Sequence, residues 1–171
     1  IRKKILYTGF LKYENFWIKK IKKLKNNLKT NKKIVVVATR GPTYESHKKS
    51  SFVSIIESIV KSVKKIKNVK IVFKIHPNKN QDEIDIIKEV TLNNNFKSFI
   101  LSKSHPMNLA ADAHACISTN TSVCLDFLYA KKSVIEFFDA KKENKNNVGV
   151  IFNIKANQWM SNFENYKLVN N

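Results

Sequence analysis

HACISTNTSVCLDFLYAKKSVIEFF, residues 114 to 138, is the stretch that decides the fold class. HACIS (His114 to Ser118) and SVIEFF (Ser133 to Phe138) are short and apolar, and they predict two strands. Between them, apolar residues at helical spacing from Val123 to Leu128 predict a helix. A strand, a helix and a second strand in this order form a parallel pair joined by a crossover helix. The stretch therefore predicts an α/β domain.

The same alternation extends upstream. Three more strands are expected at Ile34 to Ala38, Val69 to Ile75 and Phe96 to Leu101. Helices are expected at Tyr13 to Leu28, Phe52 to Ile66, Gln81 to Val90 and Pro106 to Ala111. Because crossovers between parallel strands are right-handed, this order predicts a Rossmann-like, doubly wound parallel sheet. Toward the end of the chain, residues 148 to 154 are expected to form an edge strand and Trp159 to Tyr166 a last helix.

Composition bounds the chain to one domain. Its 171 residues are 43% hydrophobic, which is enough for one substantial core. No apolar run approaches the roughly 20 residues needed to cross a bilayer. The two cysteines fall in an expected strand and an expected helix, which favours reduced, buried thiols and a cytoplasmic location. Because the sequence starts at Ile1 without a signal-peptide pattern, we interpret it as part of a longer protein.

The charge balance allows two interpretations. Lys and Arg number 32 against 13 Asp and Glu, giving a formal net charge of +19. Such a charge attracts nucleic acid, anionic lipid or phosphorylated substrates. The alternative is a compositional bias of AT-rich coding DNA, in which Lys, Asn and Ile dominate throughout. Since the basic residues are spread rather than clustered with aromatics, we favour the second interpretation, and nucleic acid is not an expected partner.

Polar residues follow the expected strands, where ligands of open parallel sheets bind. After the first strand, Arg40 can pair with a phosphate and Gly41 allows close approach of the backbone. After the second, Pro77 fixes a turn that aims His76 over the sheet edge, as a donor to a phosphate or as a general acid. A purely structural histidine is the alternative. His105, after the third strand, is a weaker candidate for lining a base pocket.

The turn after the fourth strand is rich in hydroxyls. Ser118, Thr119, Thr121 and Ser122 precede an expected helix N-terminus, where an anion is favoured. An ordinary helix cap from Asn120 or Thr121 is the alternative. Asp126 and Glu136 can accept hydrogen bonds from ribose hydroxyls, or they can be solvated surface residues or lysine partners.

Several chemistries are excluded. With three glycines, the chain has neither a G-x-G-x-x-G fingerprint nor a phosphate loop of the G-x-x-x-x-G-K-[ST] type. His114 and Cys116 lack a second pair at ligand spacing, so no zinc site is expected. No serine nucleophile elbow is present.

KIHP, the hydroxyl-rich turn and SVIEFF together resemble the C-terminal domains of GT-B glycosyltransferases. The pattern is most similar to bacterial surface-polysaccharide enzymes of the polysialyltransferase-like and CDP-glycerol glycerophosphotransferase-like kinds, and it covers residues 7 to 140. Tyr7 to Trp17 resembles the interdomain segment of such enzymes. The resemblance implies that residues 1–30 are an interdomain segment with the first helix, and that residues 31–171 are the nucleotide-sugar-binding domain. The N-terminal domain would be absent.

The resemblance also assigns roles. It implies that His76 and Pro77 form the HP motif, that Ser118, Thr119, Thr121 and Ser122 form the Ser/Thr motif, and that both hold the phosphates of a cytidine nucleotide. Asp126 falls where such families place an acidic residue. Thr and Asn stand where paired serines are more usual, and Ser133 stands where proline is more usual.

The implied function is binding of the nucleotide-sugar donor in a glycosyltransferase of capsule or other surface-polysaccharide biosynthesis. His76 would be the catalytic residue, no metal or cofactor would be needed, and CMP or CDP donors are favoured over UDP. A glycan or lipid-linked acceptor and peripheral association with the inner face of the membrane are implied as well. Because the catalytic base lies in the absent domain, this chain is expected to be inactive alone. The alternatives are a UDP-N-acetylglucosamine 2-epimerase-like enzyme and a non-catalytic basic module that binds RNA or anionic surfaces.

Overall fold

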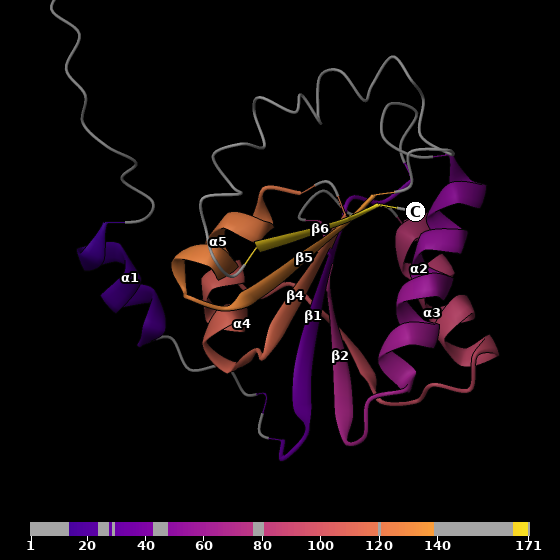
Figure 1. Cartoon of the computed structure of the whole chain (residues 1–171), viewed down its shortest axis with the longest axis horizontal. Coiled ribbons are helices and arrows are strands. Elements are labelled where there is room, and N and C mark those ends of the chain that lie inside the picture. Colours follow the sequence, from indigo (N-terminus) through magenta and orange to yellow (C-terminus); the bar gives the residue numbers. More distant parts are fainter. Residues whose placement is uncertain are drawn as a thin grey trace, which may run out of the picture.

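The chain forms one six-stranded parallel sheet with helices on both faces (Figure 1). The computed structural model describes residues 14–23, 28, 30–42, 48–76, 81–119, 121–138 and 166–170. The strands are β1 (Lys33–Thr39), β2 (Val69–Lys74), β3 (Phe99–Ser102), β4 (Ala115–Thr119), β5 (Ser133–Phe138) and β6 (Tyr166–Asn170). The helices are α1 (Asn15–Lys22), α2 (Lys49–Lys64), α3 (Gln81–Asn93), α4 (Pro106–Asp112) and α5 (Val123–Tyr129). The predicted α/β fold class is confirmed.

The order of strands across the sheet is β3-β2-β1-β4-β5-β6. The chain therefore winds outward from β1 in one direction as far as β3, then returns to the other side of β1 and winds outward again. This reversal between β1 and β4 makes the sheet doubly wound.

Each face of the sheet carries its own core. Alternate residues of β1 point to opposite faces, so Val35 and Val37 belong to a first cluster and Val36 to a second. The first cluster is built with α2 and α3, and its buried members all lie between Val35 and Phe96. Partly buried residues outside that range pack against it, namely Phe99, Leu101, Ile117 and Phe137. The second is built with α4 and α5. Figure 1 shows the two pairs of helices on opposite sides of the sheet. Coverage on both faces explains the uninterrupted apolar run in β1.

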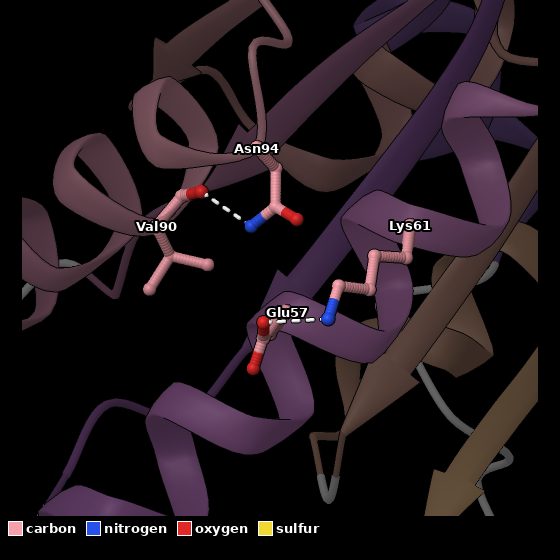
Figure 2. Close-up of polar contacts among 4 residues, drawn as sticks. All are labelled: Glu57, Lys61, Val90 and Asn94. Atoms are coloured by element: carbon pink, nitrogen blue, oxygen red, sulfur yellow. Dashed lines mark hydrogen bonds and ion pairs between the residues drawn. The ribbon is translucent and has the colours of Figure 1, made fainter.

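Polar contacts on the outer surface complete the α2 and α3 layer. Within α2, Lys61 Nζ lies 2.7 Å from Glu57 Oε1, and at the end of α3 the Asn94 side chain donates to the Val90 carbonyl at 2.8 Å (Figure 2). Lys64 of α2 donates to the Asn94 carbonyl at 2.8 Å. An exposed helical ion pair of this kind contributes only about 0.3–0.5 kcal/mol. The apolar cluster beneath therefore holds this layer in place.

Several element boundaries differ from the sequence expectation by one to a few residues. β3 starts at Phe99 rather than Phe96, because Phe96 is buried in the first cluster and its N–H donates to the Thr91 carbonyl at the end of α3. α1 spans Asn15–Lys22 within the longer range predicted for it. The expected helix ending at Tyr166 is wrong at that residue, since Tyr166 begins β6 and pairs with Val134. Pairing with β5 outweighs the local helical pattern there. Residues 148–154 and 159–165 lie outside the described residues.

Both cysteines are free and buried, as predicted. Cys116 lies in β4 and Cys124 in α5. Burial raises the pKa of the Cys116 thiol well above its ordinary value, and it raises the pKa of Cys124 to about 12. Both are therefore neutral thiols near pH 7. In the described part of the chain, no helix is long and apolar enough to span a bilayer.

Candidate functional site

The winding reversal places a candidate site at the carboxyl ends of β1 and β4. Thr39 and Thr119 pair in register as the last residues of these two strands. These two strands belong to opposite halves of the fold, because β2 lies beyond β1 on one side and β5 lies beyond β4 on the other. Ligands of open α/β sheets bind at such a point. We call the ends of β1, β2 and β4, with the residues directly following them, the switch-point site.

Three predicted groups meet at this edge. Arg40 and Gly41 directly follow β1, and Ser118 and Thr119 end β4. His76 stands two residues beyond Lys74, which pairs with Ala38 of β1. Arg40 and His76 are exposed, whereas Gly41, Ser118 and Thr119 are buried. Pro77 lies outside the described residues. The site thus combines two exposed basic residues with three buried residues that end or follow the neighbouring strands.

The turn after β4 makes hydrogen bonds within itself and to the first residue of α5. Thr121 Oγ1 accepts a hydrogen bond from the Val123 N–H at 3.1 Å, and Ser118 Oγ donates to the Thr121 carbonyl at 3.3 Å. The N-cap residue of α5 is Ser122, whose side chain makes no capping hydrogen bond, so the expected cap at Thr121 is one residue early, and Asn120 is outside the described residues. Ser122 is exposed just before α5. Thr119 Oγ1 is buried and has no hydrogen-bond partner among the residues that the structure describes.

Asp126 and Glu136 are interior residues. Asp126 is fully buried and Glu136 is 3% exposed, so the solvated-surface interpretation of both was wrong. Glu136 pairs in register with Ser118 on the neighbouring strand. After burial, the charges on Glu136 and Asp126 act to raise the thiol pKa of Cys124. Their role toward a ribose stays a prediction.

Two other histidines have structural contacts. His105 Nδ1 accepts a hydrogen bond from the Met107 N–H at 3.2 Å and caps α4. Its ring therefore lies at the start of α4, after the outer strand β3, and its assignment to a base pocket stays a prediction. His114 Nδ1 accepts from the Ile34 N–H at 3.2 Å. Among the described residues, no group of three His, Cys, Asp or Glu side chains converges as metal ligands would.

Sequence reasoning missed Glu83, a fully buried carboxylate of the site. Thr39 Oγ1 donates to Glu83 Oε1 at 2.7 Å. Burial raises the pKa of Glu83, while the Thr39 hydrogen bond and the charges of His76 and Lys74 act to lower it. The available signal was its spacing: Glu83 stands three, four and seven residues before Ile86, Ile87 and Val90, which places it on the apolar face of α3.

Lys74, the last residue of β2, was missed as well. It is 7% exposed, its Nζ donates to the Ile75 carbonyl at 2.6 Å, and burial lowers its pKa. A partly desolvated cation near Glu83 adds positive potential beneath His76.

A shallow cavity of about 210 Å³ lies at the opposite edge of the sheet. Its lining includes Lys32, Lys70 and Lys97 near the starts of β1, β2 and β3. Lys32 Nζ donates to Ser98 Oγ at 3.0 Å across it. Since ligands of such sheets bind at the carboxyl ends, the switch point is the stronger candidate site.

No protein-family model and no curated protein matches the chain. Among solved structures, it is similar to KpsC, a β-Kdo 2,7 transferase of Thermosulfurimonas dismutans, at 20% identity and a TM-score of 0.44, with 70% of this chain covered. It is also similar to MnaA of S. aureus, in a structure with UDP, at 12% identity and a TM-score of 0.46, with 74% of this chain covered. A third similar structure is that of a Listeria monocytogenes protein titled a putative UDP-N-acetylglucosamine 2-epimerase, at 10% identity and a TM-score of 0.45, with 86% of this chain covered. The matches cover 39%, 34% and 42% of those chains.

Proposed function

We propose that this chain is the donor-binding domain of a nucleotide-sugar-dependent glycosyltransferase of surface-polysaccharide synthesis. The observation that carries the proposal is the convergence of Arg40, Gly41 and His76 with the end of β4 at the switch point. These residues come from three adjacent strands, and two of them are exposed and basic. The ligand that fits such an edge is a nucleotide phosphate, with a cytidine nucleotide favoured by the sequence resemblance.

In this proposal the side chains stabilise negative charge. Arg40 can donate two parallel hydrogen bonds to phosphate oxygens, and Gly41 lets the backbone approach them. His76 donates to the leaving phosphate, where charge develops during transfer. An inverting transfer also needs a base to activate the acceptor, which the proposal assigns to a different domain. We therefore expect no turnover by residues 1–171 alone.

His76→Ala is expected to weaken nucleotide binding by about 10- to 100-fold, because a hydrogen bond to a charged group contributes about 1.5–3 kcal/mol. Calorimetric titration with CMP, CDP and UDP measures this and identifies the preferred base. Lys61→Ala is the matched control, since it removes a positive charge from the outer face of α2. The proposal fails if none of the nucleotides binds, or if His76→Ala binds as tightly as the wild type.

A second candidate role is attachment to an anionic membrane surface through α1. Phe16 is 71% exposed and Trp17 44% exposed, and their rings contact edge to face at 6.2 Å. Lys19 and Lys20 are exposed on the same helix, and Lys20 Nζ lies 5.3 Å from the Trp17 ring centre. The helix contains no acidic residue. Exposed aromatics beside lysines on a helix are the features that hold a protein at the interface of anionic lipid.

Co-sedimentation with phosphatidylglycerol vesicles tests this role. We expect binding to these vesicles, weaker binding to phosphatidylcholine vesicles, and loss of binding in Phe16→Ser/Trp17→Ser. Leu92→Ser is the control, because it removes an exposed apolar side chain from a different helix, α3, and this variant should bind like the wild type. Equal binding to both vesicle types, or none, would refute the role, and a dimer that the double variant dissociates would assign this surface to a second copy.

A further inference from the structure

Glu83 lies where the loops after β1 and β2 meet. It is the third residue of α3, the helix that follows β2, yet its carboxylate accepts a hydrogen bond from Thr39 at the end of β1. It also packs against Gly41: a Cβ built on Gly41 would lie 2.9 Å from Glu83 Cβ and 3.1 Å from Oε2. One side chain therefore limits how the β1 loop can sit against the start of α3.

The charge of Glu83 is incompletely compensated. Its side chain is fully buried, and Oε2 has no hydrogen-bond partner within the described ranges. The titratable groups acting on it are Lys74, at the end of β2, and His76, whose charge and backbone N–H both favour the ionised carboxylate. Burial outweighs these effects and raises the carboxyl pKa. Protonation of Glu83 thus removes an unfavourable buried charge.

Both flanking loops carry candidate ligand-binding groups. Arg40 stands between Thr39 and Gly41, the two residues that Glu83 contacts, and His76 stands at the other loop. A displacement of Glu83 would therefore move Arg40 and His76 relative to each other. An ionised Glu83 would also repel an anion bound between them, because its charge is not fully paired.

We propose that Glu83 is a positioning residue of the switch-point site: it fixes the β1 loop against His76, and its protonation state sets how tightly the site holds an anionic ligand. This inference rests on the proposed function in so far as the ligand is a nucleotide phosphate. Glu83 touches no ligand in this account. It acts through Arg40, Gly41 and His76.

Glu83→Gln separates charge from shape. The amide keeps an oxygen that can accept from Thr39, keeps nearly the same volume and stays neutral at every pH. Thr39→Val removes the donor while leaving the carboxylate in place. Glu57→Gln is the matched control, because Glu57 is exposed and ion-paired with Lys61 on α2 (Figure 2).

The ligand-free protein provides the first readout. We expect the backbone amide resonances of Gly41 and His76 to shift with one common midpoint, raised above the ordinary pKa of a glutamate carboxyl, and we expect this shift to disappear in Glu83→Gln. Because the folded carboxyl has the raised pKa, its contribution to stability is complete below the unfolded pKa and is lost as pH rises through the folded pKa. Glu83→Gln should therefore gain stability relative to the wild type over that interval. The inference would be overturned if the Gly41 and His76 resonances shifted with different midpoints, or if the common shift persisted in Glu83→Gln.

The affinity for inorganic phosphate and CMP provides the second readout, measured by calorimetry across that pH interval. His76 contacts the ligand in the proposed function, so the comparison is made in a His76→Ala background, in which only the Glu83 charge differs between the variants. There, affinity should fall about tenfold as pH rises through the Glu83 titration, if a bound anion raises the carboxyl pKa by one unit. Adding Glu83→Gln should abolish this fall, whereas Glu57→Gln should not. If affinity still falls with pH after Glu83→Gln is added, the inference is overturned. If the wild type binds neither ligand, the proposed function is overturned instead. The amide titration of the ligand-free protein would then still decide whether Glu83 is coupled to Gly41 and His76.

Discussion

Phe73→Ala is expected to lower the free energy of unfolding by about 3–5 kcal/mol, a large share of the roughly 5–15 kcal/mol typical of a domain. Phe73 is fully buried in β2 and belongs to the first core cluster. Its ring meets that of Phe99 edge to face, with centroids 6.2 Å apart. Truncation would remove this contact and leave a cavity between the sheet and its helices. Urea denaturation followed by circular dichroism measures the change.

Leu92→Ala is the control for this prediction. Leu92 lies in α3 and is 53% exposed, so its truncation should change stability by no more than about 0.5 kcal/mol. If Phe73→Ala and Leu92→Ala lowered the free energy of unfolding by the same amount, the packing described for β2 and α3 would be incorrect.

Gly41→Ala is expected to have the second large effect, on stability and on ligand affinity together. The new Cβ would lie 2.9 Å from Glu83 Cβ, an atom held by the α3 backbone rather than by a flexible side-chain end. Relief therefore requires a shift of the β1 loop, and overpacking of this kind costs about 1–3 kcal/mol. Since the same loop carries Arg40, nucleotide affinity should also fall by about tenfold or more, equivalent to at least ~1.4 kcal/mol.

Thermal denaturation and nucleotide titration of one Gly41→Ala sample measure both effects. Glu83→Ala should not rescue the variant, because the closest atom is the Cβ that alanine retains. A normal melting temperature with normal affinity would show that the loop adjusts without cost, and would remove Gly41 from the site.

The alternating order of strands and helices was predictable because each element carries its own period. Ile34 to Ala38 is apolar at every position, which indicates a strand covered on both faces, and β1 has that environment. The start of β3 was harder to predict, because an apolar Phe96 fits either the first residue of a strand or a core residue before it. Only the packing against α3 decides between the two. β6 is a strand because it pairs with β5, and this pairing cannot be read from the local sequence of Tyr166–Asn170.

The site was predictable to the extent that it depends on strand ends. Arg40, His76 and Ser118 were located because each follows or ends an expected strand, and parallel strands bring those ends to one edge. Glu83 was not identified, because an acidic residue in the first turn of a helix is explained by the helix dipole alone. Its partner Thr39 is 44 residues away, and only the folded chain shows that contact.

The two-sided core also has a consequence for the newly made chain on the ribosome. The cluster beneath α2 and α3 has all its buried members between Val35 and Phe96, so most of it can close once that length has emerged. The cluster on the other face extends to Val134. At about 5–20 residues per second, β1 then exposes Ile34, Val36 and Ala38 for on the order of seconds before α4, α5 and β5 arrive to cover them. During that interval a half-finished sheet presents an apolar surface, which is what a chaperone binds and what an aggregating neighbour would contact.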